Sequence, residues 1–137
     1  MIFDRTTLLS DAQAITADAA STNTIDLGPI KSGMVRDIGK GKPIPLLIQV
    51  VETFNNLTSM TFALQTDDNE AFSSAKTVWV SGAILLADLV AGKVIVPEYV
   101  TRGTNERYMR LYYDITGTAP TTGKITAGVT MGNQSNG

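Results

Sequence analysis

The 137-residue sequence contains neither cysteine nor histidine. Without thiols there is no disulfide framework, and cysteine usage does not reveal the redox compartment. Without imidazole, a histidine-based metal site, a Ser-His-Asp hydrolase and a Cys-His nucleophile each lose an essential group. We therefore expect a protein that is not an enzyme and that holds no metal or cofactor.

Long apolar runs and an excess of positive charge are also missing. The longest uninterrupted apolar run covers residues 83–87, far short of the roughly 20 residues that a membrane helix needs. The opening MIFDRTTLLSDAQ lacks the apolar region of a secretory signal, so synthesis in the cytoplasm is expected. The formal net charge is −2, whereas nucleic-acid-binding domains usually carry a basic surface. We expect no membrane and no direct nucleic-acid partner.

The composition is that of a folded globular chain, with 43% apolar and 18% charged residues. A chain of this length is the usual size of one domain and buries about two-thirds of its unfolded surface. Residues 1–137 are therefore predicted to form a single domain.

Apolar residues recur with a period of two, which predicts short β-strands. A helix is indicated only at 85–92, where good helix formers precede Gly92. Asn55-Asn56 predicts a two-residue reversal, because asparagine accepts a positive φ. The strands are predicted at 46–54, 57–66, 76–80 and 93–97, with weaker candidates at 24–27 and 34–38.

The most regular pattern lies near the C-terminus. Residues 107–115 and 125–131 alternate around a loop rich in Gly, Pro and Thr, which predicts a hairpin. On the first strand Met109, Leu111 and Tyr113 share the face predicted to point inward with Arg107 and Ile115. The opposite face mixes aromatic and charged groups: Tyr108, Arg110, Tyr112 and Asp114.

About eight short strands, turn signals roughly every ten residues and one short helix predict an all-β, antiparallel β-sandwich. A jelly roll is the leading topology, although the pattern does not separate it from other Greek-key arrangements. Residues 1–20 are predicted to form an extended N-terminal arm, and the polar tail 133–137 is predicted to be frayed.

Motifs for chemistry are few. Paired carboxylates could serve a glycosidase, but the sequence brings no two of them together, and solvated positions are expected instead. DDNE at 67–70 departs from a calcium loop at its fifth and sixth positions and is predicted to be a turn. Residues 33–42 lack the spacing of a phosphate-binding loop. The carboxylate candidates are Glu52, Glu98, Glu106 and Asp114.

Two groups of side chains are candidates for a protein interface. Arg36, Lys40 and Lys42 form a basic cluster with Lys31 in a loop, where the alternatives are solvation and docking onto an acidic protein surface. The second group is Arg102, Tyr108, Arg110 and Tyr112. Tyr and Arg are enriched at interface hot spots, but the same side chains could simply pack across strands.

Three segments, FALQTDDNEAFSSAKTVW, ADLVAGKVIVP and RYMRLYYDITGTAPTTGKITAGV, resemble the capsid cement (decoration) proteins of certain tailed bacteriophages. The opening MIFDRTTLLSDAQAIT resembles the start of those proteins as well. The resemblance implies a jelly-roll virion protein on the outer capsid surface. It would bind neighbouring major capsid subunits as a homo-oligomer, with a dimer favoured over a trimer, through strand addition and charge complementarity.

Two other functions remain open besides the weak possibility of a carboxylate enzyme. A carbohydrate-binding or host-recognition jelly roll would need a flat row of exposed aromatics, for which Trp79, Tyr108 and Tyr112 are the available set. A tail or baseplate structural protein would share the same fold class and differ in its place in the particle.

Overall fold

The computed structural model describes residues 3–31, 33–34, 36–95 and 99–132. Within these ranges the secondary structure is almost entirely β. The elements are β1 (Phe3–Ala14), β2 (Ala19–Ala20), β3 (Ile25–Asp26), β4 (Leu46–Glu52), β5 (Leu57–Asp67), β6 (Lys76–Leu85), the 3-10 turn η1 (Leu86–Asp88), β7 (Tyr108–Gly117) and β8 (Lys124–Thr130).

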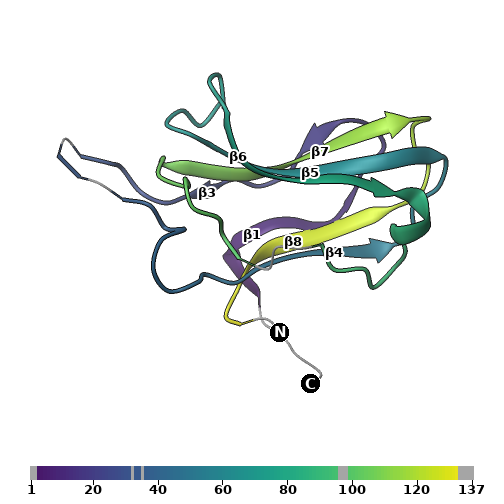
Figure 1. Cartoon of the computed structure of the whole chain (residues 1–137), viewed down its shortest axis with the longest axis horizontal. Coiled ribbons are helices and arrows are strands. Elements are labelled where there is room, and N and C mark those ends of the chain that lie inside the picture. The colour runs from purple at the N-terminus through teal and green to yellow at the C-terminus, as the bar shows by residue number, and fades with distance from the viewer. Residues whose placement is uncertain (1–2, 32, 35, 96–98, 133–137) are drawn as a thin grey trace.

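The strands form two antiparallel sheets that face each other (Figure 1). One is three-stranded with the order β1-β8-β4, and the other is five-stranded, with β2 and β3 both on β7, followed by β5 and β6. Bridges from Gln49 to Val94 and from Pro45 to Tyr99 place residues 93–95 and 99–100 along the edge of β4 that does not pair with β8. The chain changes sheets after β1, β3, β4 and β7, and between β6 and β7 it passes beside β4, which is the strand order of a jelly roll. The predicted all-β sandwich is confirmed.

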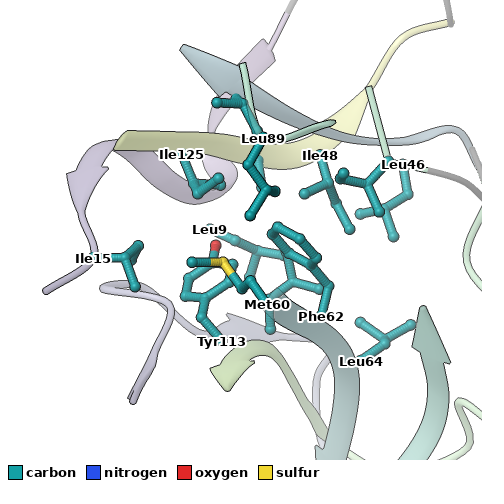
Figure 2. Packing of buried hydrophobic residues seen from close by; sticks show 14 of the residues in the cluster. Leu9, Ile15, Leu46, Ile48, Met60, Phe62, Leu64, Leu89, Tyr113 and Ile125 are labelled. Carbon is teal, nitrogen blue, oxygen red and sulfur yellow. The ribbon is translucent and has the colours of Figure 1, made fainter. Parts of the chain in front are cut away.

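The core lies between the two sheets, and each sheet contributes its inward row of side chains (Figure 2). From β5 come Met60, Phe62 and Leu64, all fully buried, as the period-two pattern predicts. Phe62 meets Tyr113 of β7 edge to face, with ring centroids 5.7 Å apart. The three-stranded sheet supplies Leu9, Leu46, Ile48, Val50, Ile125 and Ala127.

One buried hydroxyl links the two sheets. The phenol oxygen of Tyr113 lies 2.7 Å from Ser10 Oγ on β1, and Ser10 Oγ donates to Gln13 Oε1 at 2.6 Å. Because the serine has a single hydroxyl proton, Tyr113 is the donor to Ser10. Gln13 continues the chain, accepting from the Thr22 amide and donating to the Ala20 carbonyl. Burial raises the pKa of Tyr113 well above its usual value, so the phenol stays protonated.

The predicted C-terminal hairpin is wrong in its pairing, although both strands exist. β7 pairs with β5, β2 and β3, whereas β8 pairs with β1 and β4 in the opposite sheet. The loop 118–123 therefore crosses between sheets. The alternating pattern indicates which face of a strand is buried, but it does not indicate which other strand pairs with it. Of the residues predicted to point inward, Met109, Leu111 and Tyr113 are buried, whereas Arg107 and Ile115 are only half-buried.

The Asn55-Asn56 reversal is also a crossing between sheets, because β4 and β5 belong to different ones. Asn56 does take a positive φ, of 66°. The Asn55 side chain binds the other crossing loop, accepting from the amides of Thr121 and Thr122 and donating to Thr121 Oγ1. The two connections thus hold each other at one end of the sandwich.

The predicted helix at 85–92 is reduced to the single turn η1, because β6 continues through Leu85. After η1 the chain must descend to the other sheet, where Leu89 is fully buried between the layers (Figure 2). The Gly92 amide then donates to the Val50 carbonyl of β4 at 2.8 Å. Tertiary burial of the leucine overrides helix propensity here.

Two weaker strand predictions also need correction. Residues 34 and 36–38 form no strand, and Ile38 instead donates its amide to the Thr104 carbonyl in another loop. Of the strand predicted at 93–97, Val94 forms an isolated bridge with Gln49, and 96–97 lie outside the described residues. The predicted strand at 24–27 is present as β3.

The expected N-terminal arm over 1–20 is an edge strand from residue 3 onward. β1 pairs with β8 from Phe3 to Ala14, and both Leu9 and Ile15 are buried in the core. Several register shifts interrupt this ladder, and they explain why the sequence shows no regular period. The predicted frayed tail at 133–137 lies outside the described residues.

Leu9→Ala should test whether β1 is part of the fold. The substitution removes a fully buried side chain, so we expect the free energy of unfolding to fall by about 2–5 kcal/mol in urea denaturation. The neighbouring Leu8→Ala is the control, because Leu8 is only half-buried, and its effect should stay below about 1.5 kcal/mol. Equal, negligible effects of both substitutions would mean that this segment is an arm after all.

Tyr113→Phe should isolate the hydrogen bond between the sheets. The ring and its contact with Phe62 are kept, so we expect a loss of about 1–2 kcal/mol in unfolding free energy from the missing hydroxyl. Tyr112→Phe, on the half-buried outer side of the same strand, should change stability by less than about 0.5 kcal/mol. The link has no energetic weight if the two variants unfold at the same urea concentration.

Candidate protein-interaction surfaces

The candidate carboxylates are dispersed over the molecule. Glu52 on β4 accepts from the Gly123 amide and lies 3.4 Å from Lys124 Nζ. Asp114 is exposed on β7 in the other sheet, opposite Thr61. Glu106 is half-buried, and Glu98 lies outside the described residues. Within the described ranges, no three acidic side chains come close enough to hold a metal ion.

The acidic stretch 67–70 is a turn, as its composition predicts. Asp67 is buried and accepts hydrogen bonds from the amides of Asn69 and Ser74 and from the Ser74 hydroxyl. Burial alone would raise the pKa of Asp67, but these bonds outweigh it and leave the pKa below its usual range. The side chain therefore bonds to the backbone and hydroxyl of its own loop.

Tyr108, Arg110 and Tyr112 stand on the outer face of the five-stranded sheet, as the alternation predicts. The Arg110 guanidinium lies 4.2 Å from the Phe72 ring centroid and 5.8 Å from that of Tyr112. Its Nε also donates to Gln65 Oε1 on the neighbouring strand at 2.9 Å. For Arg110 the sequence left two alternatives, an interface hot spot and packing across strands. Its contacts within the protein are those of packing across strands.

An ion pair beside Tyr108 was not predicted. Arg107 binds both carboxylate oxygens of Asp26 on β3 at 2.9 Å, and its guanidinium lies 5.0 Å from the Tyr108 ring centroid. The Arg107 hydrogen bond and the Gly28 amide lower the pKa of Asp26 to about 2. Nothing in the sequence indicated this pair, because 81 positions separate its two members.

The row of aromatics needed for a flat sugar-binding face is not assembled. Trp79 stands opposite Leu64, an inward residue of β5, and packs against the core. Tyr112 stands opposite the outward residue Ala63. The indole and the tyrosines therefore occupy opposite sides of the sheet, because the side-chain direction alternates along each strand.

The members of the basic cluster have different environments. Arg36 donates to the carbonyl oxygens of Leu27 at 2.7 Å and Gly28 at 3.1 Å, so its guanidinium holds another stretch of backbone. Lys40 and Lys42 are exposed. Arg102, which the sequence analysis grouped with the tyrosines, is also exposed. It lies in a loop that packs against the loop carrying Lys40 and Lys42.

These two loops, residues 36–44 and 99–104, are called the basic loop pair, and they lie at the left end of the sandwich in Figure 1. Asp37 joins them: one carboxylate oxygen accepts from the Gly39 amide and the other from the Gly103 amide, both at 2.9 Å. Gly39 itself lies so close to the backbone of Thr101 that a Cβ there would overlap the threonine carbonyl. The loops therefore pack backbone to backbone.

A groove on the basic loop pair was missed by sequence reasoning. It has a volume of about 250 Å³, and Tyr99 at its side is 50% exposed. The sequence signal was GKGKP, whose glycines and lysines alternate; it was weighed as a phosphate-binding loop and as part of a basic cluster, and neither interpretation indicated a groove. The groove is lined by Gly39, Gly41, Pro43, Tyr99, Val100, Thr101 and Arg102.

The Asp37 contact should be lost in acid. The Gly103 hydrogen bond, with that of Gly39, lowers the pKa of Asp37, so the contact stabilises the loops above the ordinary aspartate pKa of about 4 and is lost as the pH falls through the lower folded value. We expect the amide proton shifts of Gly39 and Gly103 to titrate together, with a midpoint below that ordinary value, in NMR spectra recorded from pH 7 to pH 2.

The Gly92 amide is the internal control for that titration, because it donates to a backbone carbonyl that does not ionise. Its shift should stay constant until the whole protein unfolds. Asp37→Asn should abolish the step at Gly39 and Gly103. A shared midpoint at or above the ordinary aspartate pKa would contradict the proposed contact.

A protein-family model matches most of this chain. No curated protein matches this sequence. The family model named Bbp16 matches residues 9–129, which run from the buried centre of β1 almost to the end of β8 and include both sheets and the basic loop pair. The chain belongs to the Bbp16 family.

Proposed function

We propose that this chain is a structural virion protein that binds the outer surface of a tailed-phage capsid as a cement protein. The observation that carries the proposal is the strand order of the two sheets, which is the jelly-roll arrangement that the resemblance implies. The resemblance itself extends over most of the chain in the same segment order. In this role the protein acts through its surface, without catalysis and without a cofactor.

The edge of the five-stranded sheet supports such a role. Within the described ranges β6 pairs only with β5, so its other edge presents unpaired backbone groups. Val80 and Leu85 on this strand are 56% and 58% exposed. Unpaired edges and exposed apolar side chains are features of surfaces that receive a partner's strand. A capsid subunit or a second copy of this chain would be such a partner.

The energetics of capsid binding fit a protein without a deep site. A protein that binds assembled subunits and not free ones stabilises the assembly by mass action. Contacts with two or more subunits, or from both members of a dimer, raise the effective concentration, so that each contact can be weak. This molecule presents three separate surfaces: the outer face of the five-stranded sheet, the unpaired edge of β6 and the basic loop pair. Such an arrangement suits several weak contacts better than one strong contact.

Binding to assembled shells is the direct test. The purified protein should co-sediment with shells that lack it and should not bind free major capsid subunits. The temperature at which packed particles release DNA should rise with protein concentration, because about 2.7 kcal/mol is gained at 100 times the dissociation constant.

Two results would contradict the cement function. One is equal resistance of the particles to heat and osmotic shock with and without the protein. The other is immunogold labelling of intact virions at the tail or baseplate and not at the shell, which would favour a tail structural protein. Specific binding on a glycan array, in the absence of shell binding, would favour host recognition.

A further inference from the structure

The basic loop pair has features of a docking site for one kind of partner. Its two loops are fixed by backbone contacts: Asp37 bridges them, Ile38 donates to the Thr104 carbonyl, and Val100 donates to the Ile44 carbonyl at 3.0 Å. The Thr104 hydroxyl is buried and donates to the Thr101 carbonyl at 2.8 Å. A surface held in this way loses little conformational entropy when it binds.

The groove between these loops has the size of a side-chain pocket. At about 250 Å³ it is smaller than the roughly 300–1,000 Å³ of typical small-molecule sites. Its wall combines the Tyr99 ring, Pro43 and Val100 with the bare backbone of Gly39 and Gly41. Such a wall suits one apolar side chain lying against the aromatic ring.

Charge on the basic loop pair is opposite in sign to that of the rest of the chain. Residues 36–44 and 99–104 contain four basic side chains and one acidic side chain, a net +3. Since the whole chain is −2, the remaining residues carry −5. The acidic member, Asp37, is occupied by the two glycine amides. The exposed members Lys40, Lys42 and Arg102 flank the groove in sequence or line it.

We propose that the basic loop pair binds an acidic protein segment that inserts one apolar side chain into the groove beside Tyr99. The three exposed cations then pair with carboxylates on both sides of the inserted residue, which gives charge complementarity around an apolar centre. The inference deepens the proposed function, in which this segment belongs to a capsid subunit.

The same charges do not favour a nucleic acid. Neutralising a phosphate backbone takes a row of cations, and each additional contact adds to affinity. Here the three exposed cations surround a short apolar groove, and the −5 carried by the rest of the chain repels a long polyanion. A short segment that carries its charges near one apolar residue matches the surface better.

A peptide titration tests the site without any capsid. The probe is N-acetyl-Glu-Glu-Leu-Glu-Glu-amide, and its uncharged counterpart has Gln in place of each Glu. In NMR spectra of the whole protein, the acidic probe should shift amides of residues 36–44 and 99–104, and the uncharged one should bind about tenfold more weakly. Shifts elsewhere, no shifts, or equal binding of the two peptides would overturn the proposal.

Matched charge reversals sharpen the titration. Lys42→Glu should weaken binding of the acidic peptide about tenfold. Lys93→Glu makes the same charge change at an exposed position next to Val94, whose bridge to Gln49 lies away from the Pro45–Tyr99 bridge, and it should change binding by less than about twofold. If both variants weaken binding equally, the peptide responds only to the net charge of the protein, and the proposal is wrong. Tighter binding of single-stranded oligothymidylate than of the peptide would replace it with nucleic-acid binding.

Shell co-sedimentation separates this inference from the cement function. If the wild type and Lys93→Glu bind shells and Lys42→Glu does not, both stand. If all three bind equally, the cement function stands and the loop pair is not the docking site. If the wild type binds no shells but the acidic peptide still binds the groove, the cement function falls and the acidic-segment site remains.

Discussion

A buried phenol on β7 must find a hydrogen-bond partner between the sheets, and this constraint reaches through much of the fold. Tyr113 is fully buried, and its hydroxyl is satisfied by Ser10 of β1 in the opposite sheet. Ser10 in turn depends on Gln13, which also binds the backbone at Ala20 and Thr22. The irregular N-terminal strand is therefore fixed by polar bonds as well as by Leu9 and Ile15, and the two layers are held in one relative position.

That fixed relation between the layers positions the loops at the ends of the sandwich. At one end the crossing connections bind each other through Asn55. At another, the loops 36–44 and 99–104 follow from the pairing of Pro45 with Tyr99 beside β4. The close packing of Gly39 on Thr101 and the carboxylate of Asp37 then fix the loops themselves. The basic side chains are carried by a rigid backbone, which is what a docking surface requires.

Much of the fold was predictable because burial leaves a period of two in each strand. The inward residues Met109, Leu111 and Tyr113 of β7 were identified correctly for that reason, and the turn at Asp67 was identified from its Asp- and Asn-rich composition. The pairing partners were not, since an alternating strand has the same pattern whether its neighbour lies beside it or across the core. The candidate site was identified in part: the exposure of Lys40, Lys42 and Arg102 agrees with a surface role. Tyr99 and the groove were missed, because a groove is a property of two distant loops.

The sequence by itself determined an all-β chain without thiols or imidazoles, and the face that each strand buries, because these follow from residue type and local periodicity. Tertiary structure alone decided that β7 and β8 lie in different sheets and that the N-terminal segment completes the three-stranded one. It also decided that two separated basic segments form one surface around Tyr99. These features depend on contacts between residues far apart in the chain. The energies of such contacts leave no sign in the local sequence pattern.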